Sequence, residues 1–366
     1  MRTPAENQLK LRAILMSIVV VLLLFALSAC SNDSGAKGGE GDLISPIATE
    51  SEMPTPFATS TDTVTPTTLP KTVLLLAPNG SDAELVADLE ILLAELAEAD
   101  GFELEIVPEL ILEGLDENIK IVVAVAPNQG IQELASAAPQ TQFLSVGIPG
   151  VESVSNLSSI GATGTRPDQQ GFIAGYLAAT ITPDWRTGVI STADTISGVT
   201  TRKAFVNGVI FFCGLCRASK PPFIEYPQFY EVPAAAGQAE MQSAADYLIS
   251  NAVQTVYLPP EVGNQEVYEY LAQAGLILIG GETPPASVRG QWAATIGPDW
   301  MTPVRELWPR LIANEAGIGM DVPLLIEEIN PDLFSPGRQR LVDETLFDLH
   351  SGYIDTGIDP GTGDTP

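Results

Sequence analysis

The side chains with the most distinctive chemistry are two cysteines in Cys213-Gly214-Leu215-Cys216. A redox pair with this spacing normally opens a helix directly after a strand, whereas this pair follows an apolar segment, 199–212, that predicts a helix. A metal site would need two further ligands, and the chain contains a single histidine, His350. We therefore predict a structural disulfide between Cys213 and Cys216, with a redox role as the alternative.

The third cysteine, Cys30, ends the segment Leu27-Ser28-Ala29-Cys30. A basic start and an apolar run, 13–27, precede it, as in a secretory signal peptide, and the run is short for a membrane span of about 20 residues. The segment resembles the bacterial lipobox, whose cysteine is diacylated and becomes the first residue of the mature chain. We predict a signal peptide over 1–29 and a lipid on Cys30, which would hold the protein at the extracytoplasmic face of the cell membrane. The alternatives are an uncleaved anchor or an ordinary signal with an incidental cysteine.

The charge balance limits the partners. With 46 acidic and 17 basic residues, the formal net charge is −29, which disfavours nucleic acid and anionic lipid surfaces. Hydrophobic residues make up 45% of the chain, so a sizeable core is expected despite this charge. We predict a small-molecule ligand and no nucleic-acid partner.

Signatures of catalysis are lacking in the sequence. It contains no GxSxG, no HExxH, no GxxxxGK and no GxGxxG after a predicted strand. We therefore predict a binding protein that uses no metal or other cofactor. A surface hydrolase that uses paired acids is the less favoured alternative.

The elements that must position a site alternate along the chain. The apolar run 73–77 predicts a buried strand, and 102–107, 119–126 and 142–146 predict further strands. Apolar residues at helical spacing follow the strands at 73–77 and 119–126. Ser81 and Glu84 have the spacing of a capping box at the start of the first helix. The best helix in this half is 168–182, where Gly171 and Gly175 would let another backbone approach closely. A second cycle predicts strands at 187–191, 229–232, 255–258 and 276–280, with helices at 199–212, 237–250 and 265–274.

This alternation predicts an α/β protein with two lobes, each a parallel sheet wrapped by helices. We assign 71–183 to lobe 1 and 184–296 to lobe 2, and we expect 297–354, with helices at 304–314 and 341–349, to return and pack mainly on lobe 1. Residues 30–70 are rich in Gly, Ser, Thr and Pro and predict a disordered linker. The tail, 355–366, is expected to be flexible.

Ligands of α/β sheets bind outside the carboxyl ends of the strands. Six polar residues fall at such ends and are the predicted ligand-binding residues: Asn79, Asp82, Asn128, Asp194, Glu261 and Glu282. The competing interpretation is that such residues serve as helix caps and turns. Tyr257, Trp292 and Trp300 could stack on a ligand, although core packing is the favoured interpretation for each.

Four segments resemble a known family in the order in which the family has them. They are Asp168–Ala179 (DQQGFIAGYLAA), Phe205–Gly208 (FVNG), Gly275–Glu282 (GLILIGGE) and Ser351–Ile354 (SGYI). These segments are similar to the basic membrane protein family, the substrate-binding lipoproteins of ABC importers that include purine-nucleoside binders. The resemblance implies a two-lobed fold of the type I periplasmic-binding-protein kind, a small organic ligand and an ABC permease as partner. A sensor lipoprotein that presents its bound state to a membrane receptor is the alternative.

The first ligand loop departs from that family. The family has Asp-x-Ser-Phe-Asn there, and this chain has Asp82-Ala83-Glu84-Leu85-Val86, which retains the acid and lacks the aromatic and the amide. The family's lysine after the return strand is also missing, since Gly297-Pro298-Asp299 occupies that place. These departures argue against a purine nucleoside, and Asp82 and Glu282 are the predicted polar anchors, one from each lobe.

Overall fold

The computed structural model describes residues 71–365. The predicted signal peptide, Cys30 and the predicted linker, 30–70, lie outside these residues. The described residues form one compact unit. Within the described part, no helix is both long and apolar enough to cross a membrane.

The first sheet contains six strands, and all of its paired neighbours are parallel. One face of this sheet is covered by apolar residues of the helix 83–100, such as Leu89 and Leu93, together with apolar residues of the helix 301–312. The short helix 131–137 covers the other face. In spatial order the strands are β11 (Gly319–Met320), β5 (Leu157–Ile160), β4 (Gln142–Val146), β3 (Ile119–Val125), β1 (Lys71–Leu76) and β2 (Phe102–Val107). The helices are α2 (Ala83–Asp100) and α8 (Met301–Ile312) on one face and α3 (Ile131–Ala137) on the other, with a 3₁₀ turn, η1 (Leu112–Gly114).

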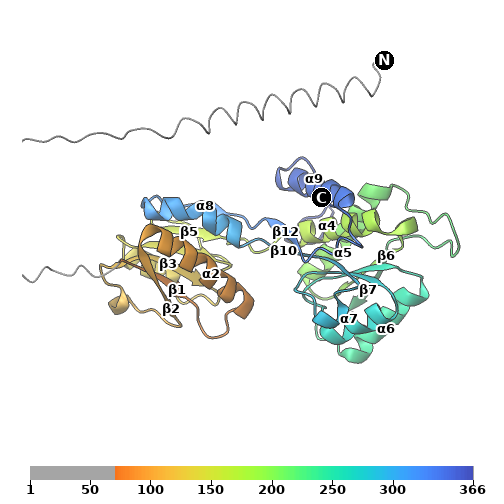
Figure 1. Cartoon of the computed structure of the whole chain (residues 1–366), viewed down its shortest axis with the longest axis horizontal. Helices are drawn as coiled ribbons and strands as arrows, with labels where there is room; N and C mark the ends of the chain where they lie inside the picture. The colour runs from red at the N-terminus through yellow and green to blue at the C-terminus, as the bar shows by residue number, and fades with distance from the viewer. Residues whose placement is uncertain (1–70, 366) are drawn as a thin grey trace, which may run out of the picture. The chain divides into compact units, whose positions relative to one another are not determined.

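The second sheet also contains six strands, of which the edge strand β12 runs antiparallel to its neighbour. In spatial order they are β12 (Leu324–Glu327), β10 (Trp292–Pro298), β9 (Ile277–Gly280), β8 (Thr255–Leu258), β6 (Thr187–Thr192) and β7 (Gln228–Val232). Figure 1 shows α6 (Gln238–Ser250) and α7 (Gln265–Gln273) on one face and α4 (Pro167–Ile181) and α5 (Ile196–Cys213) on the other. Two 3₁₀ turns, η2 (Pro183–Trp185) and η3 (Ala286–Val288), and the last helix, α9 (Pro336–His350), complete this lobe.

The chain passes between the two sheets three times, and this corrects the predicted division at 183. β5 belongs to the first sheet, whereas α4 packs on α5 of the second. The chain returns between β10 and α8, and it crosses again between β11 and β12. The prediction that 297–354 packs mainly on lobe 1 is wrong for β12 and α9, because β12 hydrogen-bonds to β10 and Leu349 of α9 lies in the core of the second lobe. Each lobe is thus assembled from segments far apart in the sequence.

Part of the C-terminal tail, which the sequence predicts to be flexible, packs on the second lobe. Thr356 and Ile358 are buried, and the Thr356 hydroxyl donates a 3.0 Å hydrogen bond to the carboxylate of Asp168. Asp168 is fully buried at the start of α4 and forms a 2.7 Å salt bridge with Arg166. A buried carboxylate needs such partners, and the tail supplies one of them.

The glycines of α4 allow the closest helix packing in the molecule. A Cβ at Gly171 would lie 2.3 Å from the carbonyl oxygen of Thr201, and one at Gly175 would lie 2.1 Å from that of Phe205. Gly208 of α5 meets the carbonyl oxygen of Phe172 in the same way, at 2.0 Å. The predicted close approach at Gly171 and Gly175 is confirmed, and the partner is α5.

Candidate functional site

The loops after the parallel strands of the two sheets contact each other directly. The Thr283 hydroxyl, after β9 in the second lobe, donates a 2.7 Å hydrogen bond to the carboxylate of Glu84, in the first turn of α2 in the first lobe. Both residues follow a strand at its carboxyl end, where ligands of α/β proteins bind. The candidate site is therefore the junction between these two sets of loops.

Glu282 is a partly buried acid at this junction whose pKa is perturbed. Its pKa is raised, first because burial disfavours the charged form and then because other carboxylates surround it. Those carboxylates belong to Glu84, Asp82 and Glu261. The structure thus brings Asp82 and Glu282, the two predicted anchors, into one electrostatic group that spans both lobes.

A second acid, Glu327 at the end of β12, extends this group. Burial raises its pKa, followed by the charges of nearby carboxylates. Those carboxylates belong to Asp299, Asp88, Glu328 and Glu84. Within residues 71–365, every charged group that shifts the pKa of Glu282 or Glu327 is acidic. The junction therefore favours a positively charged group over an anionic one. The sequence analysis missed Glu327, because the short edge strand before it was not predicted.

Two of the predicted ligand residues serve as a helix cap and a turn in the first lobe. Asp82 is the N-cap of α2, and its carboxylate accepts hydrogen bonds from the backbone N–H groups of Glu84 and Leu85 at 2.9 and 3.2 Å. Asn128 accepts from the N–H groups of Gly130 and Ile131 before α3. Asp82 is thus a helix cap and Asn128 a turn residue ahead of α3, as the competing interpretation had it, while Asp82 still contributes charge to the junction.

The predicted capping box at Ser81 and Glu84 is wrong. The Ser81 hydroxyl instead donates to the carbonyl oxygens of Pro78 and Ala126, at 2.8 and 2.7 Å, and so joins the loop after β1 to the loop after β3. Because Asp82 caps the helix, the Glu84 side chain is free to reach the second lobe. Asn79 is exposed in the same turn.

The remaining predicted residues join loops of the second lobe. The Asp194 carboxylate accepts a 2.7 Å hydrogen bond from the N–H of Ala234 and so ties the loop after β6 to the loop after β7. Glu261 accepts a hydrogen bond from the Ser197 hydroxyl in the first turn of α5. Both acids stabilise the arrangement of the strand-end loops, and Glu261 also acts on Glu282.

The three aromatic candidates behave mainly as core residues. Tyr257 stacks on Phe205 and is fully buried. Trp292 is buried against Tyr268, and its indole N–H donates to the Thr295 hydroxyl at 3.0 Å. Trp300 is half-buried and lies close to Gly147 and Gly161, next to the crossing from β10 to α8.

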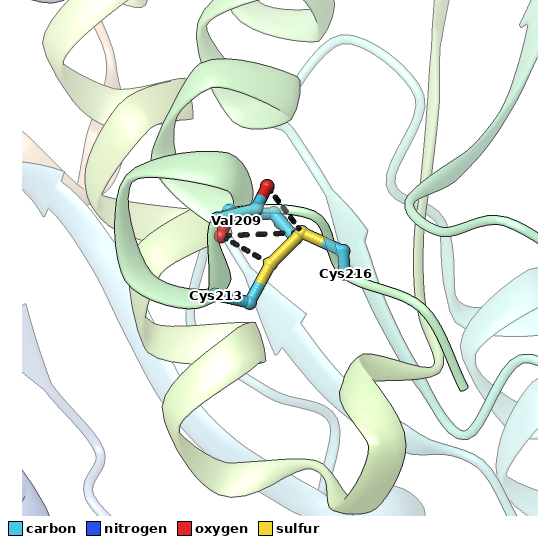
Figure 2. Close-up of a disulfide and its surroundings, with 4 residues drawn as sticks. Val209, Cys213 and Cys216 are labelled. Atoms are coloured by element: carbon cyan, nitrogen blue, oxygen red, sulfur yellow. Dashed lines mark hydrogen bonds between the residues drawn. A yellow bond between two sulfur atoms is a disulfide. The ribbon is translucent and has the colours of Figure 1, made fainter. Parts of the chain in front are cut away.

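Cys213 and Cys216, for which the sequence predicts a disulfide, are joined by one in the structure. Their Cα atoms are 5.1 Å apart, and the bond closes a short loop at the end of α5, beside the carbonyl of Val209 (Figure 2). This end of α5 is remote from the strand-end loops, because α5 begins at the carboxyl end of β6 and runs away from it for 18 residues.

Between 71 and 365, no group of three or more His, Cys, Asp or Glu side chains could hold a metal ion. His350 uses its Nε2 atom to accept a 3.1 Å hydrogen bond from the N–H of Leu324, on the third crossing between the sheets. This histidine therefore supports the connection between the lobes.

A pocket of about 370 Å³ lies behind this connection rather than at the strand ends. Arg166, His350 and residues of the C-terminal tail line it. Its titratable members have protein partners: Arg166 pairs with buried Asp168, and His350 accepts from the N–H of Leu324. Asp355 and Asp359 accept from the backbone N–H groups of Gly357 and Gly361. We assign this pocket to the support of the crossings.

No family model matches this chain, and no curated protein sequence matches it. The predicted membership of the basic membrane protein family is therefore not confirmed. Solved structures do match. A transcriptional activator of the comK gene from Bacillus halodurans is 15% identical, with a TM-score of 0.50 over 81% of this chain and 99% of that chain.

Two binding proteins are similar at lower scores. A solute-binding protein of an ABC transporter system from Aeropyrum pernix K1 is 12% identical, with a TM-score of 0.46 over 80% of this chain and 84% of that chain. AraP, an arabinose-binding protein from Geobacillus stearothermophilus, is 14% identical, with a TM-score of 0.47 over 75% and 98%. The fold is periplasmic-binding-protein-like, type I. The two sheets of mainly parallel strands, each wrapped by helices, confirm the predicted fold class.

Proposed function

We propose that this protein is a solute-binding protein that holds a small organic molecule between the strand-end loops of its two lobes. The observation that carries the proposal is the electrostatic group around Glu282, to which both lobes contribute. Binding proteins of this fold class enclose a ligand between their lobes. Because the carboxylates around Glu282 come from both lobes, their interactions depend on whether the lobes are closed.

The chemistry of the group favours a solute with a cationic or hydroxyl-rich part. A carboxylate in a partly dry site accepts strong, charge-assisted hydrogen bonds from ammonium, guanidinium or hydroxyl groups. A cation would also reduce the repulsion among Glu282, Glu84 and Asp82, and this repulsion is the energetic reason to bind one. Binding rather than catalysis is the role we propose, because Asp82, Glu84 and Glu261 of this group accept hydrogen bonds from backbone, threonine and serine groups.

We further propose that the protein is anchored outside the cytoplasmic membrane through Cys30 and delivers its solute to an ABC permease. The support is the lipobox-like segment ending at Cys30 and the oxidising compartment implied by the Cys213–Cys216 bond. The Cys30→Ala variant should be released or remain uncleaved. A variant that still carries diacylglycerol at its N-terminus would contradict the anchor.

Thermal-shift measurements on the chain from Ser31 to Pro366 test the binding role. The panel consists of polyamines, basic and neutral amino acids, sugars and nucleosides. We expect a cationic or hydroxyl-rich compound to raise Tm, and calorimetry to show about ten- to a hundredfold weaker binding to Glu282→Gln, since a charge-assisted hydrogen bond contributes about 1.5–3 kcal/mol. Glu113→Gln, in the exposed turn η1, is the matched control. If no compound on the panel raises Tm, the proposal fails.

A further inference from the structure

An exposed apolar surface lies at the far end of the second lobe, around the disulfide. Leu215 is 83% exposed and Phe223 is 77% exposed. The end of α5 adds Phe211, which is 54% exposed although it contacts Phe172 and Tyr176. We call this surface the disulfide-loop surface and define it as Ile210, Phe211, Phe212, Leu215 and Phe223 together with Arg217 and Lys220. Neither the ligand site nor the core accounts for its exposure, and exposed apolar patches of this kind mark interaction sites.

The loop that presents this surface is held from several sides. The disulfide closes its start, and a β-bridge pairs Arg217 with Glu225 at its neck. The Arg186 guanidinium donates to the carbonyl oxygens of Lys220 and Pro221, at 3.2 and 2.9 Å. The loop projects from the second lobe between α5 and β7 (Figure 1). Because its backbone is fixed in this way, Leu215 and Phe223 cannot easily fold back onto the protein.

The charge around these apolar tips is opposite to that of the whole chain. The segment 195–224 contains Arg202, Lys203, Arg217 and Lys220 and no acidic residue, in a chain of net charge −29. Arg202 and Lys203 are paired with Glu231 and Asp364. Arg217 and Lys220 are exposed and form no salt bridge within residues 71–365. Of the nearby acids, Asp184 accepts from Ser219, and Glu225 lies across the bridge from Arg217.

We propose that the disulfide-loop surface docks on a phospholipid membrane, with Leu215 and Phe223 in the headgroup–acyl boundary and Arg217 and Lys220 on lipid phosphates. Apolar side chains flanked by basic ones are the combination that binds a membrane interface. Local charge decides such contacts, because charges farther away than about 8–10 Å are screened at physiological ionic strength. The net charge of the whole chain, which disfavours anionic lipid surfaces, therefore does not decide the contacts of this surface.

The proposed anchor would make this contact possible. Forty residues, 31–70, separate Cys30 from Lys71, and a chain of that length spans at most about 130–140 Å. A lipid on Cys30 would thus keep the second lobe within reach of the bilayer. A weak surface contact would then be intramolecular, which strengthens it through a high effective concentration. The surface itself is testable without the lipid.

The test is vesicle co-sedimentation of the chain from Ser31 to Pro366, which carries no lipid. We expect binding to vesicles of phosphatidylcholine with phosphatidylglycerol that weakens with salt. The double variant Leu215→Ser/Phe223→Ser should bind at least about tenfold more weakly, which corresponds to about 1.4 kcal/mol. Arg217→Gln/Lys220→Gln should bind less and lose the salt dependence. Ile91→Ser is the matched control, because Ile91 is 70% exposed on the acidic helix α2 of the other lobe.

Any vesicle-binding result other than those just described overturns the proposal. Equal binding by the double variant and the wild type would place the membrane contact elsewhere, and no binding by the wild type would remove it. Light scattering on the same samples adds a third arm: a dimer that the double variant loses would make this surface a contact between two copies instead. All the substituted side chains are exposed, so the variants should melt as the wild type does. The solute-binding proposal is unaffected by any of these results.

Discussion

The hydroxyl of Thr283 donates a 2.7 Å hydrogen bond to the carboxylate of Glu84, across 199 positions of sequence. The bond joins the first turn of α2 to the loop after β9, and so it joins the two lobes at their strand ends. Glu84 also helps to raise the pKa of Glu282, the neighbour of Thr283. One pair of residues thus links lobe contact to the electrostatics of the proposed ligand site.

Thr283→Val should loosen the contact between the lobes. The bond is exposed, so its loss should remove about 0.5–1.5 kcal/mol from the contact while each lobe keeps its own core. Small-angle X-ray scattering should show a larger radius of gyration for the variant than for the wild type. Thr302→Val, whose hydroxyl makes no hydrogen bond within the described residues, is the control. An unchanged radius would mean that this bond does not hold the lobes together.

Glu282→Gln should stabilise the protein at neutral pH while it weakens solute binding. The pKa of Glu282 is raised in the folded state, so above that pKa the charged carboxylate destabilises the folded protein. The free energy of unfolding therefore rises as the pH falls toward 4.5, the pKa of this group in the unfolded chain. The glutamine removes this pH-dependent penalty. Melting curves at neutral and at acidic pH should show a gain in Tm that is largest at neutral pH and smaller in high salt. A variant less stable than the wild type at neutral pH would contradict the described repulsion.

Gly171→Ala should destabilise the second lobe strongly. Its Cβ would meet the backbone of Thr201 at 2.3 Å, and a backbone atom cannot move aside as a side chain end can. Overpacking of this kind costs about 1–3 kcal/mol or more. Gly337→Ala in α9 is the matched control, because nothing lies within 4 Å of its Cβ, and it should be neutral or stabilise by up to about 1 kcal/mol. Equal effects in urea unfolding would refute the close contact between α4 and α5.

His350 should make stability depend on pH below neutrality. Its pKa is lowered, first by burial and then by the charge of Arg166, while Asp299 opposes the shift. The unfolded chain then binds a proton at His350 more tightly than the folded protein does. The stability that neutral His350 contributes is therefore fully present above its pKa in the unfolded chain, near 6.5, and is lost as the pH falls through its lower pKa in the folded protein. Gln at 350 could accept from Leu324 without titrating. Urea unfolding across this range should show a smaller loss of stability for His350→Gln than for the wild type, and parallel curves would exclude the histidine as the cause.

The double variant Cys213→Ala/Cys216→Ala should lose stability modestly. The loop that the disulfide closes is short, so the bond restricts the unfolded chain little, and we expect a loss at the low end of about 2–4 kcal/mol. Thiol titration of the native protein should find neither Cys213 nor Cys216 reactive. Two reactive thiols in freshly isolated protein would show that the bond is not formed.

The sequence alone predicted most of the elements of both sheets. Buried parallel strands carry mainly apolar residues, and so β4 and β8 were placed with their observed bounds, as was the more exposed edge strand β2. The sequence also identified Gly171 and Gly175 as a site of close packing, because small residues one turn apart in a helix have few other structural roles. Short edge strands such as β11 and β12 carry too few residues for a periodic signal, and they were missed.

Tertiary structure alone decided the assignment of segments to lobes and the membership of the site. α4 continues the first lobe in sequence, yet it packs on α5, because its glycines fit only a second helix backbone. Glu84 has the spacing of a capping residue, and local sequence cannot reveal that Asp82 takes the cap and frees Glu84 for Thr283. The carboxylates around Glu282 come from loops on both lobes, and only folding brings their charges close enough to shift one another's protonation.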